Sequence, residues 1–371
     1  MTRWLRMTVV VSLALSIPGA YGTEPDWAAM PYTQHAEYQA VNAFGEGTFP
    51  TVDPVKLRGV WVNRASDLLD PAPGANPFIG GQWQVYVQAV GDADFGGTAC
   101  WMGQNIGKMV GNHPDGSYTD AEWLAELERL EHDPVTGHAF VPGDLVEVRA
   151  RAPGMFYRGK TNVNEKHFNA PEMDYDIVLL EAGYGLVPAT ITLAYVKDTS
   201  DQFIFDPSRL SGAEWFQGTL VEILNVSFVS TAGWGPNAQL TIMDDTGRTL
   251  PVLLGRGAGF STCPPPAGQV DLIGIFDQEA TAGSPYTYGY RLWIPAATGY
   301  VRPHELMLTG DVDCSGAVGF GDINPFVLAL TSPESYGADF PCCPTSNADI
   351  DGDGAVNFRD INPFVGLLTQ P

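Results

Sequence analysis

The chain is poor in basic residues: 19 lysines and arginines stand against 43 aspartates and glutamates, giving a formal net charge of -24 at pH 7. Most of the affinity of proteins for nucleic acids comes from cations that neutralise phosphates. A nucleic-acid-binding role is therefore disfavoured. The sequence also lacks a Gly-x-Ser-x-Gly elbow, a His-Glu-x-x-His motif and a Walker loop, so these motifs assign no catalytic residue.

The sequence also has no apolar run long enough to span a bilayer, which needs about 20 residues. The apolar run of residues 7–17 is shorter, follows two arginines and precedes a small-x-small sequence at residues 20–22. This arrangement is typical of an export signal. We therefore expect residues 1–22 to be a signal peptide and the mature protein to be secreted, extracellular or at the cell surface, with no membrane span.

Between residues 50 and 300, short β-like runs alternate with turns rich in Gly, Pro, Asn and Asp. This punctuation is typical of an all-β fold. Helical periodicity is nearly absent apart from Thr119 to His132, where Thr119 and Glu122 form a capping-box pattern before leucines at helical spacing. The sequence therefore predicts a mainly β body with one inserted helix.

The body contains a weak internal repeat of strand-like runs. The first half has runs at residues 56–62, 83–90, 98–102 and 142–150, and the second half has them at 216–222, 239–243, 250–254 and 268–276. In each half a first run with a central glycine leads into a hairpin and then into a later β run that follows a glycine.

This succession resembles the OB-like barrels that recur in secreted bacterial proteins. The resemblance implies two OB-like β-barrel units, residues 40–200 with the inserted helix and residues 201–304. OB barrels bind oligonucleotides or oligosaccharides, and the acidic balance argues against the first. A glycan is therefore a more plausible ligand of the body than an oligonucleotide.

Aromatic residues are the candidates for a glycan surface. Tyr286, Tyr288 and Tyr290 alternate with smaller residues, so on a strand they would share one face and offer a stacking platform. Other aromatic residues of the body are more readily explained as core, because large rings bury much apolar area: these are Trp83, Tyr86, Trp101, Trp234 and Trp293.

The strongest pattern is an acidic loop written twice near the C-terminus. The copies begin at Asp311 and Asp349, 38 residues apart (349 minus 311), and each has oxygen-bearing side chains at loop positions 1, 3, 5 and 12 with Gly at position 6. This spacing wraps a hard cation in oxygen ligands around a sharp turn. Nearly the same segment, Asp-Ile-Asn-Pro-Phe-Val, follows in both copies, so the repeated unit is a loop plus the start of a helix.

The paired unit resembles the type I dockerin module, a tandem of calcium loops that each precede one helix. The resemblance covers about residues 309–371, within a domain assigned to 305–371, and implies a small α module that binds two calcium ions. Its ligands in the first loop would be Asp311, Asp313, Ser315, Asp322 and the carbonyl of Ala317. In the second loop they would be Asp349, Asp351, Asp353, Asn357, Asp360 and the carbonyl of Ala355.

The same resemblance implies docking to a cohesin-like or other surface protein. Asp at position 12 of both loops agrees with the dockerin pattern. The neighbouring partner-reading positions hold Phe320, Phe358 and Arg359, which departs from well-studied dockerins and leaves the partner open. The alternative is that calcium merely folds a small terminal module, since a segment of this size buries little core without metal.

Five cysteines are present, and no Cys-x-x-Cys spacing supports a zinc site. Cys314 lies inside the first loop while Cys342 and Cys343 lie between the repeats, so a disulfide from Cys314 to either neighbour would clip that loop to the linker. The remaining Cys100 and Cys263 are expected to be buried structural residues. The odd count leaves at least one thiol.

Two hypotheses about function follow. The first is an exported, non-catalytic protein whose β body binds a glycan or protein and whose tail attaches it to an assembly linked to polysaccharide degradation. The second is a secreted hydrolase of glycosidic bonds recruited through the same tail, which would need two carboxylates about 5–9.5 Å apart. The adjacent pairs Asp92/Asp94 and Asp244/Asp245 fall in turns, where Asp is favoured for binding the backbone, so no catalytic residue is assigned.

Overall fold

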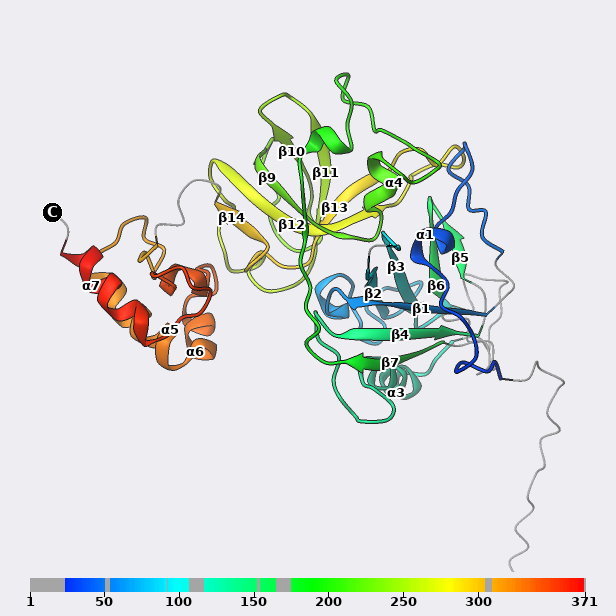
Figure 1. Ribbon diagram of the computed structural model, residues 1–371, viewed down its shortest axis with the longest axis horizontal. Coiled ribbons are helices and arrows are strands. Elements are labelled where there is room, and N and C mark those ends of the chain that lie inside the picture. The colour runs from blue at the N-terminus through cyan, green and yellow to red at the C-terminus, as the bar shows by residue number, and fades with distance from the viewer. Residues whose placement is uncertain are drawn as a thin grey trace, which may run out of the picture.

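The computed structural model describes residues 24–50, 54–91, 93–106, 117–151, 154–164, 175–303 and 309–369. The segment expected to be a signal peptide, residues 1–22, lies outside these ranges, as does Asp92. Figure 1 shows two β units packed against each other and a small helical module, orange to red, set to one side. The described residues include no helix long and apolar enough to cross a membrane.

The first unit is a seven-stranded sheet, among the described residues, with the order β5-β6-β3-β2-β1-β4-β7. Its strands are β1 (Val55–Trp61), β2 (Gln82–Ala89), β3 (Gly97–Gly103), β4 (Leu145–Ala150), β5 (Met155–Tyr157), β6 (Lys160–Asn164) and β7 (Tyr175–Glu181). All neighbours are antiparallel except β3 and β6, which are parallel. The short elements α1 (His35–Tyr38) and η1 (Ala65–Asp67) complete the unit.

The second unit contains a closed five-stranded barrel. Its strands are β8 (Ala189–Ile191), β9 (Leu220–Phe228), β10 (Gln239–Asp244), β11 (Thr249–Leu254), β12 (Gln269–Gln278), β13 (Tyr290–Ile294) and β14 (Val301–Pro303), with η3 (Leu193–Tyr195) and α4 (Gly212–Phe216) between β8 and β9. Closure comes from pairing of β12 with β9 in addition to the open order β14-β12-β13-β11-β10-β9-β8. Again one pair inside the barrel, β11 and β13, is parallel.

The boundary between the units lies before residue 200. β8 pairs with β9 of the second sheet, and Ile191, Leu193 and Val196 are buried in the core of the second unit. The boundary drawn from the sequence at residue 200 therefore assigned this segment to the wrong sheet. At the other end, Tyr38 is buried in the core of the first unit, which therefore begins before residue 40.

Helix α3 (Asp120–Glu131) confirms the expected inserted helix and its cap. Thr119 Oγ1 accepts a hydrogen bond from the Glu122 amide at 3.3 Å, and Glu122 Oε2 accepts one from the Thr119 amide at 2.8 Å. This reciprocal pair satisfies two otherwise free N–H groups of the first turn. Trp123 and Leu130 of the helix are fully buried, and α3 lies against β7 at the foot of the molecule in Figure 1.

The two units share a joint core. Val62, Leu68, Tyr86 and Ala99 of the first unit pack with Leu220, Ile275 and Trp293 of the second. The backbones touch at Gly97 and Gly218, where a Cβ added to Gly97 would lie 2.3 Å from the Gly218 carbonyl oxygen. Glycine is needed at this contact because any side chain would push the units apart.

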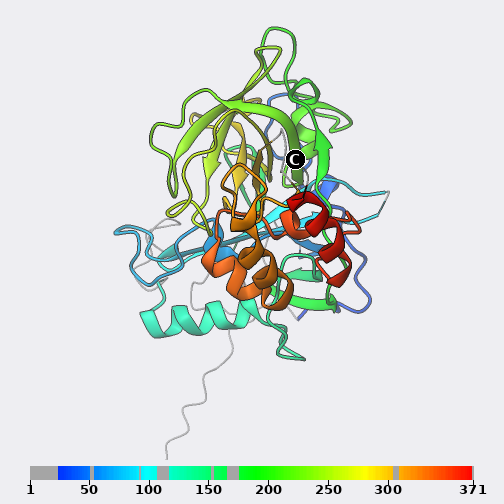
Figure 2. The ribbon, with the colours of Figure 1, turned by 90° about the vertical axis from the view of Figure 1, so that its left-hand side faces the viewer.

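The C-terminal module is helical and has its own small core. After the first loop come η4 (Phe320–Asp322), α5 (Ile323–Thr331) and α6 (Pro333–Asp339), and after η5 (Thr345–Ala348) and the second loop come η6 (Phe358–Asp360) and α7 (Ile361–Leu368). Phe326 of α5 stacks on Phe364 of α7 with ring centroids 4.2 Å apart. These two residues occupy equivalent positions in the two repeats. The helices of the repeats, α5 and α7, therefore pack against each other, as Figure 2 shows.

Candidate metal centre

The aspartate at position 12 ends each acidic loop by binding the loop's own backbone. Asp322 Oδ1 accepts from the amides of the second and third loop residues at 2.6 and 2.9 Å, and its Oδ2 accepts from the ninth at 2.7 Å. Asp360 makes the same three contacts at 2.7, 3.0 and 2.8 Å. Burial alone would raise the pKa of Asp360, but its amide donors hold the pKa below the ordinary value. The two loops are therefore closed by one geometry, used twice.

The aspartate at position 1 folds the middle of each loop. Asp311 accepts from the amides of Ser315 and Gly316 at 2.9 Å each, and Asp349 accepts from the amides of Gly352 and Gly354 at 3.0 and 2.9 Å. The glycines at position 6 have φ angles of 91° and 89°, a region that L side chains rarely adopt. Glycine is therefore required for this sharp turn in both copies.

Carboxylates gather inside both loops. Asp311, Asp313 and Asp322 each place one oxygen so that all three lie within 4.8 Å of one another, and Asp349, Asp351 and Asp353 do the same in the second loop. Asp360 is not part of the second group. Burial, with the charge of Asp322 as a smaller contribution, raises the pKa of Asp311.

The donor set of both loops fits a hard divalent cation. The remaining residues expected to bind metal lie in the same loops: Ser315 Oγ is 3.3 Å from the Ala317 carbonyl, and Asn357 Nδ2 is 2.8 Å from the Ala355 carbonyl. The atoms that these residues would offer to a cation are carboxylate, hydroxyl, amide and carbonyl oxygens, which suit calcium or magnesium and not the softer metals. Two acidic groups of this chain can thus hold a metal ion.

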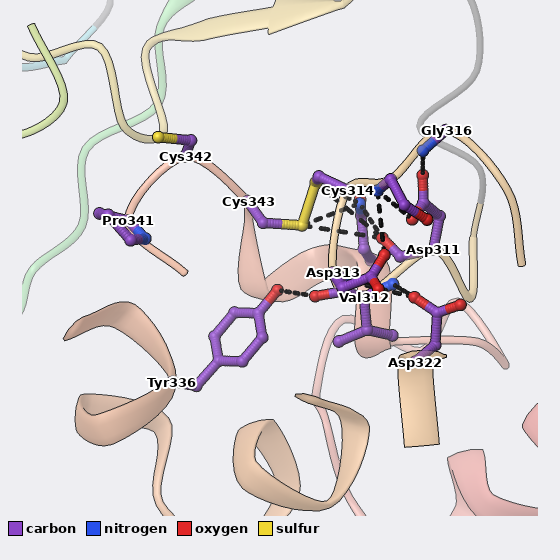
Figure 3. The surroundings of a disulfide bond; sticks show 12 residues. Asp311, Val312, Asp313, Cys314, Gly316, Asp322, Tyr336, Pro341, Cys342 and Cys343 are labelled. Atoms are coloured by element: carbon purple, nitrogen blue, oxygen red, sulfur yellow. Dashed lines mark hydrogen bonds between the residues drawn. A yellow bond between two sulfur atoms is a disulfide. The ribbon is translucent and has the colours of Figure 1, made fainter. Parts of the chain in front are cut away.

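Disulfides fasten the first loop and tie the module to the body. Cys314 pairs with Cys343, with Cα atoms 5.6 Å apart (Figure 3). Cys263 pairs with Cys342, with Cα atoms 5.4 Å apart. The first bond selects one of the two partners expected for Cys314. Cys263 is not the buried structural thiol that the sequence suggested, because it is bonded to the module. Cys100 is the remaining buried free thiol.

Two further side chains hold the first loop from the inter-repeat segment, and sequence reasoning missed both. Tyr336 Oη donates to the Val312 carbonyl at 2.8 Å (Figure 3), and Asn347 Nδ2 donates to the Asp311 carbonyl at 2.8 Å. Burial raises the pKa of Tyr336 to about 12, so the hydroxyl stays a donor. Neither residue belongs to a repeat, so no pattern in the sequence marks it.

The expected partner-reading residues lie on the surface of the module. Phe320 is 82% exposed and Phe358 is 77% exposed, each in the 3-10 turn that precedes its helix. Arg359 is exposed too, and its Nη1 lies 3.4 Å from Asp353 Oδ2 in the second loop. Large apolar rings normally bury their area, so a matched pair of exposed phenylalanines requires an explanation.

The expected tyrosine surface does not exist as one strand face. Tyr286 and Tyr288 precede β13 and are partly buried in a loop, while Tyr290 begins the strand and is fully buried. The alternation Tyr-Thr-Tyr-Gly-Tyr failed as an indicator because Gly289, at φ 88°, turns the chain before the strand starts. Trp83, Tyr86, Trp101 and Trp293 are buried, as the packing interpretation expected.

Two of the carboxylates considered for catalysis, Asp94 and Asp244, have structural roles. Asp94 accepts from the amides of His35 and Ala36 at 2.9 and 3.0 Å and so fixes the start of α1. Asp244 accepts from the amides of Thr246 and Arg248 at 2.9 and 3.0 Å within its turn. These contacts are the backbone bonds expected of aspartate in turns.

No protein-family model matches this chain, and no curated protein matches it. Among solved structures it is similar to a chain described as a replication protein A heterotrimer bound to single-stranded DNA, at 11% sequence identity and a TM-score of 0.24. The match covers 61% of this chain and 45% of that chain. The protein therefore spans less than half of that relative, and so low a TM-score carries no argument about fold or function.

Proposed function

We propose that the protein is an exported, non-catalytic binding protein whose C-terminal module, of dockerin type, binds two calcium ions and docks the β body to an extracellular or cell-surface assembly. The observation that carries the proposal is the doubled loop: a cluster of three carboxylates and the same closure by the aspartate at position 12 occur in both copies. A pair of calcium sites requires two loops that each supply several oxygen ligands.

Calcium would be held in the first loop by Asp311, Asp313, Ser315, Asp322 and the carbonyl of Ala317. In the second loop Asp349, Asp351, Asp353, Asn357, Asp360 and the carbonyl of Ala355 would hold it. The ion supplies positive charge that offsets carboxylates crowded within 4.8 Å of one another. Metal binding would therefore stabilise the module, which has only a small core of its own.

The docking surface in this proposal is the exposed pair Phe320 and Phe358, with Arg359 beside the second. Val327 and Val365, each seven positions after the phenylalanine of its repeat (327 minus 320 and 365 minus 358), are also about half exposed. Exposed apolar residues that recur at equivalent positions form a surface that a protein partner can bury. The partner class is a cohesin-like or other surface protein.

Export is supported by the cysteines of the module. Two disulfides join four of the five cysteines, and such bonds persist in oxidising compartments outside the cytoplasm. Together with the signal-like residues 1–22, this favours a secreted location. The body in this proposal consists of two OB-like units, because β1, β2 and β3 of the first and β9, β10 and β11 of the second pair in order, and β3 and β11 are each parallel to a later strand, β6 and β13.

Calorimetric titration of calcium into the mature chain tests the proposal. The full chain is required, because Cys342 pairs with Cys263 of the body. We expect two sites with dissociation constants of about 10 μM or tighter, and a rise in the helical circular dichroism signal on binding. The double variant Asp349→Asn/Asp351→Asn should lose one site and keep the other.

The matched control is Asp198→Asn/Asp206→Asn, two turn aspartates of the body, which should bind both ions. Absence of calcium-dependent heat in the parent chain would end the metal proposal. Docking is tested separately by pull-down with Phe320→Ala/Phe358→Ala, which should release a partner that the parent retains while calcium binding is unchanged.

A further inference from the structure

A cavity of about 150 Å³ lies where the two β units meet, far along the chain from the acidic loops. Strands β2, β3, β5 and β6 of the first unit form most of its wall. The second unit contributes Glu279, directly after β12, and Trp293 of β13. Sites that bind small ligands occur preferentially at such junctions between units.

One face of the first sheet is polar although it is buried. Gln84 is paired with Trp101 across β2 and β3, and Trp101 with Asn164 across β3 and β6, so the three side chains point to the same side. Asn162 shares that face, two residues before Asn164. The opposite face, with Val85, belongs to the apolar core of the unit, so packing of that core does not account for the amides.

Four residues of the cavity wall each carry a buried polar atom that has no hydrogen-bond partner within the part of the chain that the structure describes: these atoms are Gln84 Nε2, Asn162 Oδ1, Asn164 Oδ1 and Trp293 Nε1. The four residues are only 3–5% exposed. A buried polar group without a partner is energetically unfavourable. Four of them around one cavity indicate that an occupant of the cavity supplies the missing partners.

These atoms are complementary to hydroxyl groups. Two are N–H donors, on Gln84 and Trp293, and two are carbonyl acceptors, on Asn162 and Asn164. A hydroxyl both donates and accepts, so a ligand with several hydroxyls can satisfy all four. Aromatic surface from Trp101, with Tyr157 and Trp293, lies in the same wall and suits the apolar face of a ring.

The charged groups of the wall are already neutralised. Lys160 Nζ donates to Asp277 Oδ1, and Glu279 accepts from Arg158 at 2.9 Å and from Arg291 at 2.7 Å. An ionic ligand would find no free counter-charge on these groups, and its desolvation would be unfavourable. The wall therefore favours an uncharged ligand.

We propose that this cavity binds one sugar unit of a neutral saccharide. A cavity of about 150 Å³ holds one six-membered ring, as benzene shows in an apolar cavity of that size. The inference deepens the proposed function, on which it rests for the glycan, and it places the ligand between the units and not on the tyrosines near β13.

Calorimetry with four neutral disaccharides tests the site: maltose, cellobiose, xylobiose and N,N′-diacetylchitobiose, each titrated into the mature chain. We expect at least one to bind with a dissociation constant of about 1 mM or tighter. Gln84→Leu removes a donor and fills its space, so it should weaken that binding about tenfold or more. Trp293→Phe keeps an aromatic ring and removes the N–H, and should weaken binding about threefold or more.

The matched control is Gln239→Leu, an exposed residue of β10 outside the cavity, which should bind as the parent does. Gln84→Leu is expected to fold at least as stably as the parent, since Gln84 Nε2 has no partner to lose. Binding of none of the four disaccharides overturns the proposal, as does equal binding by Gln84→Leu and the parent. Either outcome would assign the cavity to ordered water alone.

Calcium separates this proposal from the proposed function. Saccharide binding should persist in EDTA, because none of the cavity residues belongs to the acidic loops. Calcium binding without saccharide binding overturns the cavity assignment and leaves the docking module intact. Saccharide binding without calcium binding overturns the proposed calcium-binding module and leaves the cavity assignment intact.

Discussion

At the residue scale, one side-chain type has three different roles, set by its surroundings. Asp322 and Asp360 accept backbone amides and close the acidic loops. Asp94 fixes the start of α1. Asp277 is fully buried between the β units, where Tyr86 Oη donates to it at 2.6 Å and Arg291 Nε donates at 2.9 Å. An aspartate carboxylate thus closes a loop, caps a helix or serves as a buried counter-ion, depending on its position.

Asp277 makes the stability of the body dependent on pH. Burial alone would raise its pKa, but Lys160 and Arg291 lower the pKa to about 2. Because this folded-state pKa is below the unfolded value of about 4, the charged form adds about 2–3 kcal/mol of stability above pH 4, which is lost as the pH falls from about 4 to 2.

Replacement of Asp277 by asparagine should destabilise the body at pH 7 by about 3–5 kcal/mol, since the buried Lys160 loses its carboxylate partner and Arg291 keeps only Glu279. Urea unfolding at pH 7, 4, 3 and 2 measures this, and the variant should lose less stability than the parent between pH 4 and 2. If the free energy of unfolding fell equally with pH in both proteins, the role assigned to Asp277 would be contradicted. Asp245→Asn, exposed in a turn, is the control and should follow the parent.

At the element scale, short local signals specify single structures. The capping box of α3 needs only Thr119 and Glu122, three residues apart, and forms as expected. The tyrosine alternation before β13 was misleading because one glycine at positive φ breaks the strand. A local pattern predicted the structure correctly where the two interacting residues lie within one helical turn, as in the cap. It failed where the backbone changes direction between the residues of the pattern, as in the tyrosine alternation.

Removal of the α3 cap has a predictable effect. Thr119→Ala should lower the free energy of unfolding of the first unit by about 1 kcal/mol, because the Glu122 amide loses its acceptor. Thermal or urea unfolding measures the change. Glu128→Ala, an exposed residue of the same helix, should stay within about 0.5 kcal/mol of the parent, and an equal loss in both variants would contradict a capping effect.

At the scale of the whole molecule, neighbouring cysteines fix the helical module to the body. Cys342 bonds to Cys263 of the second unit and Cys343 to Cys314 of the first acidic loop. The inter-repeat segment is thus bonded on one side to the barrel and on the other to the candidate metal site. A cavity of about 440 Å³, lined by Trp234 of the body and by Asp311 and Asn347 of the module, lies at this junction.

Loss of the body-to-module disulfide should release the module. In Cys263→Ser/Cys342→Ser we expect a larger radius of gyration by small-angle X-ray scattering than in the parent, because the bond that holds the module against the second unit is gone. Cys314→Ser/Cys343→Ser removes a disulfide within the module and serves as the control, with the parent's radius of gyration. Identical scattering from all three proteins would show that noncovalent contacts suffice.

The sequence was informative wherever a pattern is repeated or local. It predicted the mainly β body, since the expected runs coincide with β1 to β4 and β10 to β12 to within a few residues, and the two acidic loops with their aspartates at fixed spacing. The run expected at residues 216–222 overlaps only the start of β9. The sequence placed the boundary between the units too late, because β8 is three residues long and joins its sheet only through a parallel pairing with residues 32 positions further along the chain (221 minus 189).

By itself, then, the sequence determined the acidic loops, the inserted helix and the strand order along the chain, because spacing within a short segment fixes each of them. Only the tertiary structure decided which cysteines pair, that Asn347 and Tyr336 hold the first loop, and that buried amides from β2 and β6 meet Trp293 around one cavity. These residues come together through the packing of two units and a module. No periodicity along the chain records contacts between segments that lie far apart in the sequence.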